Sequence, residues 1–234
     1  MGAGLGQGFI LQRQMQTKKG LLAIVFVLVP FGYAFYLYPS LGDQIPTHFN
    51  IEGKPDDWSS RNSIFIMPVI MGFVSIFTFL LLTNIEKFDP KASAANIKDT
   101  LSPVAIFISG ILCALTLVVL YGISHENTPI DQLLFGVLGL LFIGMGYYMP
   151  AMKQNYFAGY KLPWTLENEE NWKKTHGLAG KFWLVGGSIQ VLAALLLSGE
   201  ILFYIFMLIT ILVSLSPILY SYSIFKKNKQ GASK

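Results

Sequence analysis

The stretch Leu101-Ser-Pro-Val-Ala-Ile-Phe-Ile-Ser-Gly-Ile-Leu-Cys-Ala-Leu-Thr-Leu-Val-Val-Leu-Tyr-Gly-Ile-Ser124 decides the fold of this chain, because none of its 24 residues is charged. As an α-helix it is about 36 Å long, enough to cross the roughly 30 Å of hydrocarbon in a bilayer. A helix also satisfies its own backbone hydrogen bonds, which a segment surrounded by lipid must do. We therefore predict a transmembrane helix here.

Five more uncharged apolar runs of similar length lie on either side of this stretch. They are Gly20 to Tyr38, Ser63 to Thr83, Gln132 to Met149, Phe182 to Gly199 and Ile201 to Ile224. Charged residues make up only 13% of the 234 residues, against about 25% in soluble domains. The sequence predicts an all-α integral membrane protein with six transmembrane helices.

Lysine and arginine fall mainly on one side of these six segments. Fifteen of the 17 lie in the N-terminal tail, the second and fourth loops and the C-terminal tail, while Lys54 and Arg61 lie in the first loop. Positively charged loops stay in the cytoplasm, so we expect both termini to be cytoplasmic and the first loop to face outward. Membrane lipid is the expected partner of the inner lysines, which leaves no need for direct nucleic-acid binding.

The chain then divides into five parts. Residues 1–19 are expected to form a mobile cytoplasmic tail, residues 20–83 the first two spans with an outer-loop module at 39–62, and residues 84–100 a cytoplasmic connector. Residues 101–225 form a four-span region with a cytoplasmic loop at 150–181, and residues 226–234 a second cytoplasmic tail. Within the outer loop, residues 47–51 are expected to be extended before a turn at Glu52 and Gly53. The glycines of the fourth span, Gly136, Gly139, Gly144 and Gly146, are expected to permit close helix packing.

The fourth loop contains a dense polar and aromatic segment, Asn155-Tyr-Phe-Ala-Gly-Tyr-Lys-Leu-Pro-Trp-Thr-Leu-Glu-Asn-Glu-Glu-Asn-Trp-Lys-Lys-Thr-His176. Thr165 suits the N-cap of a cytoplasmic helix that runs to about Thr175, ahead of the fifth span. Exposed ion pairs are expected on this helix at the i, i+4 spacing, between Glu169 and Lys173 and between Glu170 and Lys174.

Glu169, Trp172 and His176 are spaced i, i+3, i+7, which places them on one helix face. Two interpretations stay open. The face is either a docking surface or part of a site, or else Trp172 is an interfacial anchor and His176 a helix-end residue.

No arrangement of residues typical of catalysis is present, and no cofactor is predicted. The single cysteine, Cys113, excludes an intramolecular disulfide and a Cys-based zinc site. The alternative of a metal-dependent membrane hydrolase depends on convergence of residues from two outer loops, namely His48, Glu52, Asp56, Asp57, His125 and Glu126. A small-molecule permease is a weaker alternative, because the six predicted spans contain no ionisable group apart from Cys113 and tyrosines.

Two stretches resemble a known family. The segment Gly146-Tyr-Tyr-Met-Pro150, the polar segment from Asn155 to His176 and Ala179-Gly-Lys181 look like the signature of the SdpI family of bacterial toxin-immunity membrane proteins. Ile45-Pro-Thr-His-Phe-Asn50 and Gly53-Lys-Pro-Asp-Asp-Trp58 resemble the small module that precedes that signature. Together with their spans, these stretches cover residues 20–225.

The resemblance implies a six-span protein of the bacterial plasma membrane that protects the cell against a secreted killing peptide. It also implies signal transduction, in which a transcriptional repressor is recruited to the membrane. The expected cytoplasmic partner-binding residues are Pro163, Trp164, Thr165, Glu169, Trp172 and His176. The residues expected to recognise the peptide at the outer face are His48, Asn50, Asp56, Asp57 and Trp58.

Overall fold

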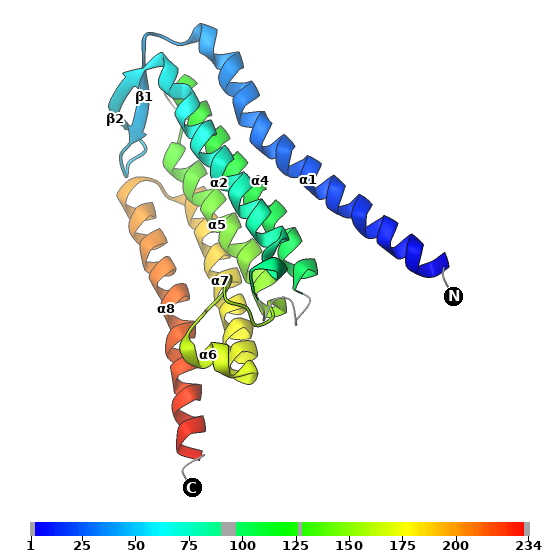
Figure 1. The fold of residues 1–234 in the computed structure, drawn as a ribbon. Coiled ribbons are helices and arrows are strands. Elements are labelled where there is room, and N and C mark those ends of the chain that lie inside the picture. The colour runs from blue at the N-terminus through cyan, green and yellow to red at the C-terminus, as the bar shows by residue number, and fades with distance from the viewer. Residues whose placement is uncertain (1–2, 90–96, 126–127, 232–234) are drawn as a thin grey trace.

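The computed structural model describes residues 3–89, 97–125 and 128–231 (Figure 1). Six long helices occur in these ranges: α1 Ala3–Leu37, α2 Ile66–Thr83, α4 Lys98–Ser124, α5 Ile130–Tyr148, α7 Glu169–Leu196 and α8 Gly199–Gly231. Each contains most or all of a segment that is long and apolar enough to cross a membrane. The prediction of a predominantly helical membrane protein with six spanning segments is therefore confirmed.

The outer surface of the helical bundle is apolar. Large side chains such as Phe73 and Leu195 are 70% and 71% exposed. A soluble protein rarely leaves so large an apolar area in water, whereas hydrocarbon solvates it without cost. The exposed apolar side chains thus suit a bundle surrounded by lipid.

The spans alternate in direction, so their connections gather at two ends of the bundle (Figure 1). One end bears two short strands, and we call it the hairpin end. The other bears residues 149–168, and we call it the loop end. Both termini lie toward the loop end, and the N-terminal half of α1 slants away from the other helices (Figure 1).

The hairpin is the one described part of the fold that departs from an all-α protein. Strand β1, Gln44–Phe49, pairs antiparallel with β2, Pro55–Ser60. The turn between them is held by the Asn50 side chain, whose oxygen accepts the backbone N–H groups of Glu52 and Lys54, both at 3.0 Å. Gly53 has φ +73°, which glycine adopts without strain. An extended segment followed by a turn at Glu52 and Gly53 is confirmed, but the strand begins earlier, at Gln44, and ends at Phe49, so Ile51 belongs to the turn.

The hairpin rests on the helices through a small apolar cluster. Ile45 is only 1% exposed and packs with Ala34 and Leu37 of α1, Ile64 and Leu120 of α4. Three-residue and five-residue 3-10 helices, Tyr38–Ser40 and Arg61–Phe65, join the hairpin to α1 and α2. Two further 3-10 helices, Ile85–Lys87 and Met149–Ala151, follow α2 and α5 at the loop end.

Helices α5 and α7 cross in backbone contact at two levels. A Cβ added to Gly187 would lie 2.7 Å from the Gly139 carbonyl oxygen, and one added to Gly146 would lie 2.8 Å from the Gly180 carbonyl oxygen. Only glycine permits so close an approach. The predicted role of Gly139 and Gly146 in helix packing is confirmed, and their partners are glycines on α7.

Several predicted boundaries differ from the structure. Helix α1 begins at Ala3, so residues 3–19 extend the first span as a helix and do not form an irregular tail. Its glycines lower helix propensity, but an apolar helix that follows directly allows the helix to propagate backward at little cost.

The predicted cytoplasmic helix is also arranged differently. A short helix, α6, covers Pro163–Glu167, and Thr165 lies inside it. Asn168 is the N-cap of α7, because its side chain accepts the N–H of Asn171 at 2.8 Å. From there α7 is continuous to Leu196, so no break separates the polar helix from the fifth span. Gly199, assigned to that span, begins α8.

Candidate functional site

The loop end is built around two buried aromatic side chains of α7. Trp172 and His176 are 1% and 0% exposed, and their rings stack with centroids 4.0 Å apart. The Trp172 indole N–H donates to the Met152 carbonyl at 2.7 Å, at the point where the chain leaves α5. Met152 and Trp172 belong to an apolar cluster with Leu101 and Val104 of α4. The stacked pair therefore fixes the start of the loop to two helices.

Both ring nitrogens of His176 are used. Nδ1 donates to the Trp172 carbonyl at 2.9 Å, and Nε2 accepts the backbone N–H of Tyr160 at 3.0 Å. This pattern requires the neutral ring with its proton on Nδ1. Gly159 has φ +99°, and a Cβ there would lie 2.2 Å from Nε2. Histidine and glycine thus form a matched pair that positions the loop.

Polar side chains complete the loop from within. The Asn155 side-chain oxygen accepts the N–H groups of Phe157 and Ala158 at 2.9 and 2.7 Å. The Thr165 hydroxyl donates to the Tyr160 carbonyl at 2.7 Å and accepts the Leu162 N–H at 3.0 Å. Asn155 and Thr165 are both fully buried. Their bonds satisfy backbone groups that an irregular buried segment would otherwise leave unpaired.

The loop is also attached to the neighbouring connector and to α8. The Asp89 carboxylate accepts the Tyr156 N–H at 2.6 Å. The Trp164 indole N–H donates to the Ser221 hydroxyl at 2.5 Å, and the Asn171 amide donates to the Ser221 carbonyl at 3.1 Å. These contacts join segments far apart in the sequence into one unit.

Tyr160 links the loop to two spans. Its hydroxyl donates to the Val213 carbonyl of α8 at 3.2 Å and accepts the Trp183 indole N–H of α7 at 2.8 Å. Burial raises the pKa of the Tyr160 phenol above its usual value, an effect that the bond from Trp183 partly offsets. The phenol is therefore neutral at physiological pH.

The six residues expected to bind a cytoplasmic partner are divided by their exposure. Pro163 and Glu169 are exposed and Trp164 is half-buried, whereas Thr165, Trp172 and His176 are buried. Glu169 and Glu170 form ion pairs with Lys173 and Lys174 at 2.9 and 2.6 Å, as predicted. Glu169 therefore does not share an exposed face with Trp172 and His176. Helical spacing predicts which residues lie on one face of α7, but it does not show which part of that face the neighbouring loop covers.

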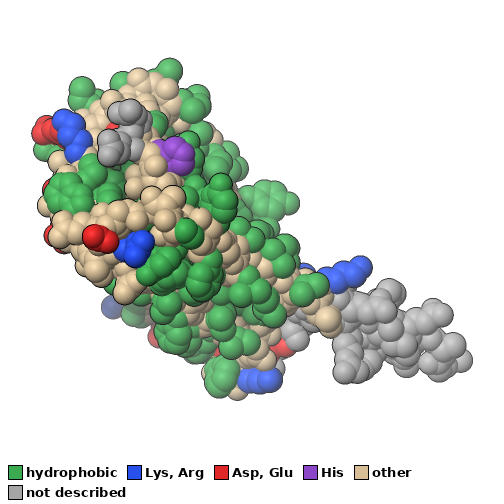
Figure 2. Space-filling view, turned by 90° about the horizontal axis from the view of Figure 1, so that it is seen from above, with side chains coloured by type: hydrophobic (Ala, Val, Ile, Leu, Met, Phe, Trp, Pro, Cys, Tyr) green, Lys and Arg blue, Asp and Glu red, His purple; other side chains and the backbone are tan. Residues whose placement is uncertain are grey.

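The residues expected at the outer face lie on the hairpin. His48 and Asp56 are exposed and contact each other at 2.5 Å, while Asn50 holds the turn. The Asp57 carboxylate accepts the N–H of Trp58 at 2.9 Å, and the Trp58 side chain is 52% exposed. Figure 2 looks onto this end of the molecule, where charged side chains are few and are scattered among apolar and uncharged ones.

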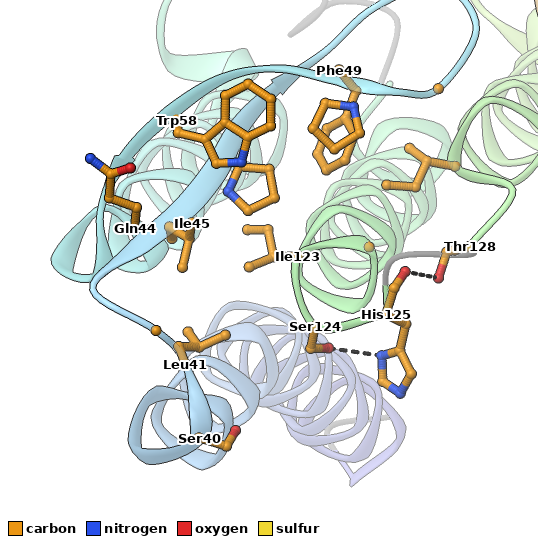
Figure 3. Close-up of a pocket in the computed structure, with 16 residues that line it drawn as sticks. Ser40, Leu41, Gln44, Ile45, Phe49, Trp58, Ile123, Ser124, His125 and Thr128 are labelled. Carbon is orange, nitrogen blue, oxygen red and sulfur yellow. Dashed lines mark hydrogen bonds between the residues drawn. The ribbon is translucent and has the colours of Figure 1, made fainter.

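A pocket of about 540 Å³ lies between the hairpin and the facing ends of α4 and α5 (Figure 3). We call it the hairpin pocket. Its lining residues are Ser40, Leu41, Gly42, Gln44, Ile45, Pro46, Phe49, Gly53, Pro55, Trp58, Gly122, Ile123, Ser124, His125, Thr128 and Ile130. Among the described residues that line it, none is aspartate, glutamate, lysine or arginine. This described lining offers hydroxyl, amide and imidazole groups among apolar ones. Glu126, between His125 and Thr128 in the sequence, lies outside the described residues.

Of the residues expected at the outer face, Trp58 lines this pocket, and the others do not. Sequence reasoning missed Ile123 and Ser124 at the end of α4, and Thr128 beyond it. No signal in one sequence places these residues opposite residues 40–58, because the contact depends on how spans separated by more than 60 residues pack.

The metal hypothesis finds no support among the described residues. No group of three or more His, Cys, Asp or Glu side chains is close enough there to hold a metal ion. Glu52 pairs with Lys54 at 2.7 Å and Asp56 pairs with His48. His125 stacks on Tyr121 of its own helix, on the α4 side of the pocket. Glu126 lies outside the described residues.

The fold and these two regions define a class of protein: a multi-pass membrane protein with a two-stranded hairpin at one end and a tightly ordered loop at the other. Comparison with known families matches residues 151–221 to the SdpI/YfhL protein family and residues 25–72 to a domain of unknown function, DUF1648. The chain is 28% identical over 210 residues to "Immunity protein SdpI" of Bacillus subtilis (strain 168), covering 90% of this chain and 97% of the relative.

These matches relate residues 151–221 to the SdpI/YfhL protein family, and nearly the whole chain to an SdpI immunity protein. The family match begins at the loop end and runs through α7 into α8, and it includes the ordered loop with Trp172 and His176. The second match includes the hairpin. No solved structure matches the chain.

Proposed function

We propose that this chain is an immunity protein of the bacterial plasma membrane, which protects the cell from a secreted killing peptide. The observation that carries the proposal is the similarity to the Bacillus subtilis immunity protein over nearly the whole length of both chains. The match includes both ends of the bundle, so it concerns the complete arrangement of hairpin, spans and loop.

We further propose that the hairpin end faces outward and the loop end faces the cytoplasm. The positive-inside rule supports this orientation, since only Lys54 and Arg61 lie near the hairpin. Both are locally engaged: Lys54 pairs with Glu52, and the Arg61 guanidinium lies 4.8 Å from the centre of the Tyr38 ring. In a Cys113→Ala background, a membrane-impermeant maleimide should label Thr47→Cys in intact cells but label Lys173→Cys only after lysis. The reverse pattern would overturn the orientation.

Protection can be measured directly. The chain is expressed in Bacillus subtilis cells that lack their own SdpI immunity protein, and the cells are challenged with the killing peptide. We expect survival at peptide doses that kill cells carrying an empty vector. Equal killing of the two strains, with the chain detected in the membrane, would overturn the proposed function.

A second proposed function is recruitment of a transcriptional repressor to the loop end. The supporting observation is that Thr165, Trp172 and His176 are buried and hydrogen-bonded to the loop backbone, while Pro163 and Glu169 are exposed beside it. A loop that is ordered beforehand loses little entropy when a partner binds. In this proposal the buried residues shape the surface and the exposed residues contact the partner.

The test of recruitment uses two exposed acids of the same segment. In cells challenged with the peptide, a fluorescent repressor encoded beside the gene should move to the membrane with the wild-type chain and the Glu167→Ala control, but not with Glu169→Ala. Equal recruitment by the two variants would remove Glu169 from the proposed surface. Without any recruitment by the wild-type chain, the signalling function fails while the immunity proposal stands.

A further inference from the structure

A second cavity lies next to the hairpin pocket. It has a volume of about 210 Å³ and is lined by Phe49, Asn50, Ile51, Gly53, Ile130, Asp131, Leu134, Phe135 and Phe203. We call it the side groove. Phe49, Gly53 and Ile130 line both cavities. The two spaces therefore adjoin, one on each side of these shared residues.

The cavities differ in chemistry. The hairpin pocket presents Gln44, Ser124 and Thr128 among its polar groups, whereas the side groove is formed mainly by apolar residues of the hairpin, α5 and α8. The carboxylate in the groove, Asp131, is 7% exposed and accepts the Gly199 N–H at 2.6 Å. It fixes the turn between α7 and α8 to the start of α5, which accounts for a buried acid at this position. The groove thus offers an apolar surface next to a polar pocket whose described lining contains no aspartate, glutamate, lysine or arginine.

The charges nearby disfavour an anionic occupant. No lysine or arginine is among the described residues that line either cavity. Asp43 and Asp57 are exposed on or beside the hairpin, and neither forms an ion pair within the part of the chain that the structure describes. The two basic residues nearby already have partners: Lys54 pairs with Glu52, and the Arg61 guanidinium donates to the Leu41 carbonyl and lies over the Tyr38 ring. A segment with basic flanking residues would be attracted to the exposed aspartates.

We propose that the hairpin pocket and the side groove together bind one amphipathic segment of the killing peptide. Polar and backbone groups of the segment lie in the hairpin pocket, apolar side chains enter the side groove past Phe49, and basic residues flank the segment at Asp43 and Asp57. This inference rests on the proposed immunity function and names the site and the chemistry of the partner.

Cysteine labelling tests the site with the purified full-length chain in detergent micelles, in the Cys113→Ala background. Gln44→Cys reports on the hairpin pocket and Ile51→Cys on the side groove, and both native residues are exposed. Thr47→Cys is the matched control, because Thr47 is exposed on the same strand as Gln44 but lines neither cavity. The probe is the killing peptide used in the survival assay.

We expect the peptide to slow maleimide labelling at Gln44→Cys and Ile51→Cys at least fivefold and to leave Thr47→Cys unchanged. Equal rates with and without peptide at the first two positions would overturn the proposal, as would the same slowing at all three. Slowing by phosphatidylglycerol added to the detergent micelles, but not by the peptide, would assign the cavities to lipid and also overturn it.

The survival assay on the Cys113→Ala parent separates the two levels of inference. A parent that protects cells but shows no peptide-dependent change in labelling refutes only the binding site. A chain that fails to protect, in both wild-type and parent form, refutes the proposed function itself.

Discussion

The contact between α5 and α7 leads to a sharp prediction, because the chain provides two helical glycines with opposite surroundings. A Cβ added at Gly187 would lie 2.7 Å from both the Gly139 oxygen and the Ile143 nitrogen, whereas one added at Gly177 meets nothing within 4 Å. Both glycines lie inside α7. Replacing each with alanine therefore separates the effect of packing from that of helix propensity.

The expected magnitudes follow from these distances. Ordinary contact begins near 3.4 Å, so α5 and α7 must move apart by the difference from 2.7 Å, about 0.7 Å, in Gly187→Ala. Overpacking of this kind costs about 1–3 kcal/mol, with the upper part of the range expected because both closest atoms belong to backbone. Alanine gains about 1 kcal/mol over glycine inside a helix, which applies to both variants. The free energies of unfolding should therefore differ by about 2–3 kcal/mol in favour of Gly177→Ala.

Thermal unfolding in one detergent measures this difference. At about 2–4 °C per kcal/mol for a chain of this size, Gly187→Ala should unfold about 4–12 °C below Gly177→Ala. Equal transition temperatures, or a more stable Gly187→Ala, would refute the claim that α5 and α7 pack backbone against backbone.

Three further predictions concern the loop end. Trp172→Phe leaves the Met152 carbonyl without its indole partner, which should cost about 1–3 kcal/mol of stability and speed limited proteolysis within residues 150–168. Trp58→Phe should not speed it. Identical cleavage rates for the two variants would contradict the claim that Trp172 holds the loop in place. Gly159→Ala places a Cβ against His176 and strains a positive φ, and the backbone strain alone should cost about 1–3 kcal/mol of stability. A melting temperature equal to that of wild type would exclude the close contact between residue 159 and His176. Burial raises the pKa of Tyr160 in the folded chain, so its contribution to stability is complete below the unfolded pKa and is lost as the pH rises through the folded pKa. Unfolding scans between pH 9 and 12 should therefore show a smaller alkaline loss of stability for Tyr160→Phe than for wild type. Equal losses in the two chains would argue against a buried phenol.

The spans were predictable because bilayer thickness and backbone hydrogen bonding impose length and composition on any helix that crosses lipid. The same holds for the i, i+4 ion pairs and for the hairpin turn, since Asn50 and Gly53 act on their immediate neighbours. The burial of Trp172 and His176 was not predictable from spacing, because it depends on a loop that folds back onto α7. The hairpin pocket was also not predictable from the sequence, because β1 and the end of α4 meet only through the packing of the spans.

The most direct test of the central claim is the dose of killing peptide at which half of the immunity-deficient cells die. It is measured with no chain, with the wild-type chain, with Gln44→Trp, which fills the hairpin pocket, and with Thr47→Trp on the same strand outside it. The account predicts that the wild-type chain and Thr47→Trp raise this dose at least tenfold, and that Gln44→Trp returns it toward the value without the chain at equal membrane abundance. Protection by Gln44→Trp equal to that by Thr47→Trp would contradict a peptide site under the hairpin, and an unchanged dose with the wild-type chain would contradict immunity itself.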